Sequence, residues 1–150
     1  MVFDQLTIND YFAGDGIPAH FDTHSPFEQP FLSVSLLSGL VMDFRKYDGE
    51  ERAVYLPPRS VAIFSGEVRF AWTHGITCRK VDLVDGELRH RSRRLSLTFR
   101  KIKFTPCQCP YYFYCDSQGY DQQTMKKNNP LLAKYLSQQN AQKLSALSPK

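Results

Sequence analysis

Short runs rich in β-branched and aromatic residues recur through residues 1–115, and they constrain the fold more than any other feature. The runs are QLTINDYF, FLSVSLLS, LVMDFRKY, AVYLP, SVAIFSG, RFAWTHGI and RLSLTFRKIKF. Turn-forming pairs such as Asp48-Gly49, Pro57-Pro58 and Asp85-Gly86 separate several of them. Because no helical pattern lies between the runs, they predict an all-β fold. A jelly roll, that is, a double-stranded β-helix, is the leading candidate.

The composition changes after Cys115 to mainly Gln, Asn, Lys and Ser. Within this part, PLLAKYLSQQNAQKLSAL spaces Leu132, Leu136 and Leu144 at multiples of four residues, which is typical of an amphipathic helix. The high polarity of the same stretch is equally consistent with a loosely held linker. We therefore divide the 150 residues into a single barrel at residues 1–117 and a polar tail or linker at residues 118–150.

Several features bear on where the protein works. No apolar run is long enough to span a membrane, and MVFDQLTIND lacks the basic region and apolar stretch of a signal peptide. We therefore expect a cytoplasmic or nuclear protein. In a reducing compartment, the close spacing of Cys107, Cys109 and Cys115 favours a metal site over disulfides. Cys78 lies apart from this cluster and is interpreted as a buried small residue.

A run of seven Lys or Arg residues without any acid extends from Arg89 to Lys103. The formal net charge of +4 does not explain it, because five Lys against two Asp in residues 116–150 contribute most of that charge. Such a run usually forms a solvated face and less often a patch for an anionic partner, such as phosphates.

His20, Asp22 and His24 alternate in the stretch GIPAHFDTHSPFE. On an extended strand, His20 and Asp22 would lie about 7 Å apart and could bind one ion, whereas His24 would lie roughly 13 Å from His20. His74 in AWTHGI is the best remaining ligand. Two His with one carboxylate is the ligand set of non-haem Fe(II) oxygenases. Taken alone, the same residues also fit solvated polar positions on a strand.

The run RLSLTFR places Arg94, Ser96, Thr98 and Arg100 on one face of a strand and its apolar residues on the other. If the arginines face inward, they need an anionic partner, because burying an unpaired guanidinium is costly. The planar guanidinium suits carboxylates, so a dicarboxylate held near a metal is the natural ligand. The opposite orientation, with the leucines packed inward, fits the spacing equally well.

These segments together resemble the catalytic barrel of the AlkB family of Fe(II)- and 2-oxoglutarate-dependent dioxygenases. The resemblance covers about residues 2–117, and the family pattern N-x-Y, H-x-D, distant H and R-x5-R is met by Asn9, Tyr11, His20, Asp22, His74, Arg94 and Arg100. It implies that His20, Asp22 and His74 bind iron and act in catalysis, and that 2-oxoglutarate is held by Asn9, Tyr11, Arg94 and Arg100. It also implies that Arg94 meets the far carboxylate.

Within the family, HFDTHSPFE, LPPRS, WTHGI and FTPCQCPYYFYCDSQ are most similar to the branch that acts on the wobble uridine of tRNA. This similarity implies a structural zinc held by His24, Cys107, Cys109 and Cys115, a common closed tetrahedral set. Without the family, three reduced cysteines in an aromatic segment remain an alternative. The implied reaction is hydroxylation of 5-methoxycarbonylmethyluridine in a tRNA anticodon loop.

Other parts of the family pattern are not found in the 150 residues. Family members carry a segment ahead of the stretch that corresponds to FDQLTIN, which covers the active site. The tRNA branch also has RNA-recognition and methyltransferase domains. We expect these parts to come from another chain or a missing segment. Two alternative functions stay open: an oxidative demethylase of alkylated nucleic acid or protein, and a truncated, catalytically inactive module that binds metal and cosubstrate.

Overall fold

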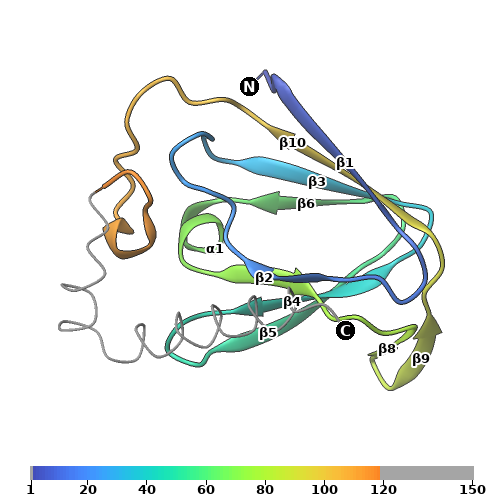
Figure 1. Cartoon of the computed structure of the whole chain (residues 1–150). Helices are drawn as coiled ribbons and strands as arrows, with labels where there is room; N and C mark the ends of the chain where they lie inside the picture. The colour runs from blue at the N-terminus through green and yellow to red at the C-terminus, as the bar shows by residue number, and fades with distance from the viewer. Residues whose placement is uncertain (1, 119–150) are drawn as a thin grey trace, which may run out of the picture.

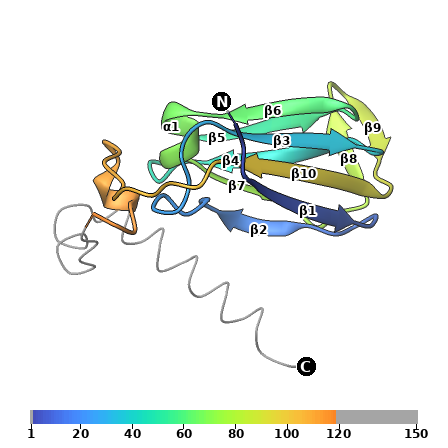
Figure 2. The ribbon, with the colours of Figure 1, turned by 90° about the horizontal axis from the view of Figure 1, so that it is seen from above.

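Two four-stranded antiparallel sheets face one another in the computed structural model, which describes residues 2–118 (Figure 1). The first, which we call the major sheet, has the order β1-β10-β3-β6. Its strands are Gln5–Tyr11, Arg94–Arg100, Phe31–Leu36 and Ser60–Phe64, respectively, and Figure 2 shows them side by side. The second, the minor sheet, has the order β2-β7-β4-β5, with bounds Ile17–His20, Thr73–Ile76, Leu40–Arg45 and Glu51–Leu56.

Three short elements complete the described part. The helix α1 (Gly66–Phe70) follows β6, β8 (Val81–Val84) pairs with β9 (Glu87–His90), and a 3-10 turn η1 spans Tyr112–Tyr114. The all-β prediction is confirmed, although RFAWTHGI is not one strand, because it divides between α1 and β7. The helix predicted from Leu132, Leu136 and Leu144 lies outside the described residues, and the division at residue 117 stays a prediction.

The two faces of the major sheet have an unusual polarity. Its inner face is largely polar, because Asn9 lies opposite Ser96 on β10, which in turn lies opposite Ser35 on β3. Its outer face is apolar, and four of its side chains are 48–64% exposed in the described part of the chain: Leu6, Ile8, Val61 and Ile63. Sandwiches normally bury the apolar face between the sheets. The inverted pattern indicates that the space between these sheets is built for a polar ligand.

The apolar core therefore occupies only part of the space between the sheets. Phe31 and Phe64 lie opposite each other on β3 and β6, and their rings stack with centroids 4.3 Å apart. Leu40, Met42, Leu56 and Ile76 of the minor sheet complete this cluster. Close packing of this kind supplies the rigidity that a neighbouring polar site needs.

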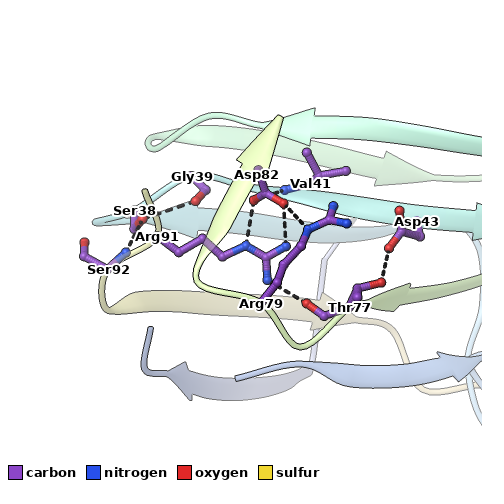
Figure 3. A network of polar contacts seen from close by, with 9 residues as sticks. All are labelled: Ser38, Gly39, Val41, Asp43, Thr77, Arg79, Asp82, Arg91 and Ser92. Atoms are coloured by element: carbon purple, nitrogen blue, oxygen red, sulfur yellow. Dashed lines mark hydrogen bonds and ion pairs between the residues drawn. The ribbon is translucent and has the colours of Figure 1, made fainter. Parts of the chain in front are cut away.

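A buried carboxylate fixes the β8–β9 hairpin to the minor sheet (Figure 3). Asp82 is 1% exposed and accepts a two-pronged pair of hydrogen bonds from Arg91, at 2.6 and 2.7 Å. It also accepts hydrogen bonds from Arg79 Nε and from the backbone N–H of Val41. Arg91 donates in addition to the carbonyl of Thr77, so the residues that directly follow β7 and β9 are held together.

The basic run does not form a continuous solvated face. Arg94 and Arg91 are buried. Five of the seven cations form ion pairs with carboxylates of other segments or of the β8–β9 hairpin: Arg89, Arg91, Arg93, Arg100 and Lys101. The run is therefore not a solvated face throughout, because side chains that are adjacent in the sequence point alternately to opposite sides of β10.

The described residues contain no helix that is both long enough and apolar enough to cross a bilayer.

Candidate functional site

His20 and His74 form the centre of a three-residue cluster. They lie opposite each other on β2 and β7, and their ring centroids are 4.5 Å apart. Asp22 joins them, with Oδ1 3.7 Å from His20 Nε2. One possible ligand atom from each residue lies within 4.8 Å of the others. The prediction of one strand for His20 and Asp22 is wrong, since β2 ends at His20, but the two side chains still converge.

The local backbone brings the two histidines close together. Gly75 follows His74, and a Cβ at this position would lie 2.8 Å from the backbone nitrogen of Ala19. Only glycine therefore allows β2 and β7 to approach in this way. His20 Nδ1 lies 2.9 Å from the carbonyl oxygen of Pro18. An Nδ1–H that donates to this carbonyl leaves Nε2 free for a metal, which is the usual outer contact of a metal-binding histidine.

The charge states in the cluster suit a divalent cation. Burial, with a further contribution from His20, lowers the pKa of His74 to about 4, so its imidazole is neutral at physiological pH. Burial raises the pKa of Asp22, but the hydrogen bond and charge of Arg100 outweigh this effect and hold the pKa below its usual value. The neutral imidazole of His74 and the carboxylate of Asp22 are therefore available as ligands, and His20 Nε2 lies beside that carboxylate.

Arg100 links this cluster to the major sheet. Its Nε donates to Asp22 Oδ2 at 2.7 Å, and its Nη1 donates to Thr7 Oγ1 at 3.0 Å. Asp22 Oδ1, on the side facing His20, takes no part in the bond with Arg100. Arg100 therefore orients the carboxylate and leaves one oxygen for a metal.

Arg94 is buried without a carboxylate. It is 2% exposed, its Nη2 donates to Ser35 Oγ at 2.8 Å, and its guanidinium carbon lies 5.5 Å from the Tyr11 ring centroid. Its Nε has no hydrogen-bond partner, and no carboxylate among the described residues lies within ion-pair distance. Since an unpaired buried cation is costly, this arrangement fits a site for an anion. The inward orientation of β10, which spacing left open, is thereby decided.

One pocket between the sheets contains all seven residues of the sequence pattern. It is partly open to solvent and is lined by Asn9, Tyr11, His20, Asp22, His74, Arg94 and Arg100. Sequence reasoning did not assign Ser33, whose hydroxyl lies 3.1 Å from that of Ser96 in the same pocket. The alternation of Ser33 and Ser35 with Leu32 and Val34 on β3 was the signal that could have revealed this polar face.

A second cluster lies where residues 101–118 pass α1 and the loop after β2. His24, Cys109 and Cys115 each offer a ligand atom within 4.8 Å of the others, and His24 Nδ1 lies 3.5 Å from Cys109 Sγ. Cys107 is outside this group of three, although its buried thiol interacts with both other thiols. Cys78, interpreted from the sequence as buried, is exposed.

The pKa values of His24, Cys109 and Cys115 in the second cluster shift in different directions. Burial lowers the pKa of His24 to about 4, so this ring is neutral. Burial raises the pKa of Cys109 to about 12, whereas hydrogen bonds from Ser117 outweigh burial at Cys115 and bring its pKa to about 7. A neutral imidazole beside closely spaced thiols is a donor set that suits zinc, which deprotonates the thiols on binding.

Comparison with known families decides the class of the protein. Residues 1–100 match the 2OG-Fe(II) oxygenase superfamily. The chain belongs to this superfamily. The predicted class, an Fe(II)- and 2-oxoglutarate-dependent dioxygenase enzyme, is thereby confirmed, and the family implies Fe(II) and 2-oxoglutarate as cofactors. The two imidazoles, the carboxylate and the unpaired Arg94 in one pocket fit both groups.

Relatives within the superfamily confirm the resemblance to the AlkB family and to AlkB homologue 8. The tRNA (carboxymethyluridine(34)-5-O)-methyltransferase ALKBH8 of Macaca fascicularis is 49% identical over 131 residues, which are 77% of this chain and 20% of that protein. An alkylated DNA repair protein ALKBH8 homolog of Arabidopsis thaliana is 45% identical over 134 residues, covering 77% of this chain and 39% of that protein. The chain thus spans well under half the length of these two relatives.

A solved structure supports the fold. OsALKBH1 superposes with a TM-score of 0.52 and 24% sequence identity, over 67% of this chain and 49% of that chain. At this identity the likeness concerns the fold alone, and it agrees with the jelly-roll prediction.

We predict that Arg94→Met weakens 2-oxoglutarate binding about tenfold or more, because charge-assisted hydrogen bonds contribute roughly 1.5–3 kcal/mol each. Isothermal titration calorimetry under oxygen-free conditions, with Fe(II) present, measures the dissociation constant. Arg93→Met is the matched control, since the adjacent Arg93 is exposed and pairs with Asp10 outside the pocket. Equal affinity in the parent and both variants would show that Arg94 does not bind the cosubstrate.

Proposed function

We propose that this chain is an Fe(II)- and 2-oxoglutarate-dependent dioxygenase in which His20, Asp22 and His74 bind the iron. The observation that carries this proposal is the convergence of these three side chains in the pocket that also contains the unpaired Arg94. A facial set of two His and one carboxylate leaves positions open for cosubstrate and O₂.

The remaining pocket residues would hold 2-oxoglutarate. Arg94 would pair with its far carboxylate, with Tyr11 and Asn9 beside it on β1, while Arg100 keeps Asp22 oriented near the iron. Bound Fe(II) would supply O₂-dependent oxidation of a C–H bond, coupled to conversion of 2-oxoglutarate to succinate and CO₂. Burial of Arg94 strengthens its attraction for the far carboxylate, because little water competes for it.

The substrate that we propose is 5-methoxycarbonylmethyluridine at the wobble position of tRNA, hydroxylated on its side-chain methylene. Support comes from the relatives named as tRNA methyltransferases and from the extent of their similarity. An anticodon loop already displays unstacked bases, so no duplex has to be opened. The basic run gives no support, because most of its cations are paired or buried. RNA-recognition and methyltransferase domains would come from another chain or segment.

Oxidative demethylation is the second candidate, and one observation favours it. The Arabidopsis thaliana relative is named an alkylated DNA repair protein. A third candidate is a module that binds metal and cosubstrate without catalysis. Measurements of succinate and of the modified product distinguish the three candidates.

We also propose that His24, Cys107, Cys109 and Cys115 hold a structural zinc. The donor atoms of three of these residues lie within 4.8 Å of one another, and the thiol of Cys107 interacts with two of them. The segment from 101 to 118 has little regular structure apart from η1, so a metal would supply much of its anchoring.

We predict that Cys109→Ser loses the zinc and lowers the thermal unfolding midpoint, because zinc binding contributes folding free energy. Elemental analysis of protein purified without chelators should give one zinc per parent chain and none in the variant. The exposed Cys78→Ser is the control and should retain both zinc and midpoint. Zinc-free parent protein would contradict the assignment.

We predict that the parent produces succinate and adds one oxygen atom to the wobble nucleoside of tRNA, and that Asp22→Ala does neither. Succinate assays and mass spectrometry of tRNA nucleosides provide the measurements, with the surface variant Asp10→Asn as a control that retains activity. Loss of a methyl group from alkylated nucleic acid or protein, with tRNA unchanged, would favour the demethylase. Iron and cosubstrate binding without succinate would support the inactive module.

A further inference from the structure

Arg69 of α1 is a buried cation outside the pocket described above. It is 2% exposed, and its guanidinium carbon lies 5.4 Å and 5.0 Å from the ring centroids of Phe31 and Phe70. No carboxylate among the described residues lies within ion-pair distance of it. Burial of a charge costs desolvation free energy unless the cation makes contacts that offset it. Its hydrogen bonds identify those contacts.

The guanidinium binds backbone rather than side chains. Its Nη1 donates to the carbonyl of Asp22 at 2.6 Å, and its Nη2 donates to the carbonyl of Thr23 at 2.8 Å. These two peptide groups are the connection between Asp22 of the first cluster and His24 of the second. The charge of the Asp22 side chain also stabilises the cation. Arg69 therefore interacts with Asp22 of the first cluster and holds the backbone that leads to His24 of the second.

Asp116 holds the next residues from the other side. Its Oδ1 accepts hydrogen bonds from the backbone N–H groups of His24 and Ser25, both at 3.0 Å, and its Oδ2 bonds with the Ser25 hydroxyl. Asp116 directly follows Cys115 in the chain. A cation thus binds the carbonyls of residues 22 and 23, and an anion binds the amides of residues 24 and 25.

This arrangement links movement at one cluster to movement at the other. If the cysteine segment loosens, Asp116 moves with Cys115 and releases the backbone of residues 24 and 25. If Arg69 is lost, the carbonyls of residues 22 and 23 lose these hydrogen bonds, and Arg100 alone holds the Asp22 carboxylate in place. We propose that Arg69 and Asp116 are positioning residues that couple the affinity of the iron site to occupancy of the zinc site. This proposal rests on the two metal assignments under the proposed function.

A double-mutant cycle tests the coupling in the full chain. Fe(II) dissociation constants are measured without oxygen, by competition with a chromogenic chelator, for the parent, Arg69→Met, Cys109→Ser and the double variant. Each single variant should bind Fe(II) about tenfold more weakly, the usual effect of losing an outer contact of a metal ligand. The double variant should bind hardly more weakly than either, because both changes release the same segment.

Three further variants separate positioning from simple destabilisation. Arg69→Lys keeps the charge and can still donate to one of the two carbonyls, so it should recover part of the Fe(II) affinity lost in Arg69→Met. Asp116→Asn lies at an exposed position and should fold normally while weakening Fe(II) binding in the same direction. Arg91→Met is the matched buried control, since its hydrogen bonds go to Asp82 and Thr77; it should lower stability and leave the Fe(II) affinity unchanged.

Failure of the coupling and failure of the iron assignment give different Fe(II) binding results. Fully additive effects in the cycle, or parental Fe(II) affinity in both Arg69→Met and Asp116→Asn, would overturn the coupling and leave the iron site intact. A parent chain that binds no Fe(II) would overturn the iron assignment itself and the coupling with it.

Discussion

The ion pair between Arg100 and Asp22 is the contact on which the rest of the site depends. It joins a central strand of the major sheet to the loop that follows β2 of the minor sheet, with Arg100 Nε 2.7 Å from Asp22 Oδ2. A buried ion pair offsets its desolvation penalty only when further hydrogen bonds satisfy both groups. Arg100 also donates hydrogen bonds to Thr7 and Gln5. The carboxylate is thereby fixed opposite His20 and His74. The two sheets therefore meet at the point where the metal cluster forms.

The space between the sheets divides into an apolar part and a polar part. Phe31, Phe64 and their neighbours pack closely, while the inner face of β10 and its flanking strands presents serines, two threonines and two arginines. This polarity leaves an apolar surface on the outer face of the major sheet, which is exposed in the described residues. On most monomers, apolar patches of this kind are small. The outer face of the major sheet therefore leaves apolar area exposed, while the inner face forms a cavity suited to charged ligands.

Much of the site could be predicted from local sequence, because its ligands follow short spacings. The pairing of His20 with Asp22, the distant His74 and the alternation of Arg94 with Arg100 were all visible. The orientation of β10 was not, since both faces fit the spacing until the serines of β3 are taken into account. The end of β2 at His20 was also missed. Arg69 and Asp116 could not be found, because their partners lie far away in the sequence and no local pattern marks them.

We propose that one pocket holds Fe(II) through His20, Asp22 and His74 and holds 2-oxoglutarate beside it through Arg94. Anaerobic titration of 2-oxoglutarate into Fe(II)-loaded protein tests it most directly, because chelation of Fe(II) by the 2-oxo acid produces a visible charge-transfer band. In the parent, the band should saturate at one equivalent of each component. In Arg94→Met, saturation should require more 2-oxoglutarate. A parent chain that binds Fe(II) yet develops no band at saturating 2-oxoglutarate would contradict it.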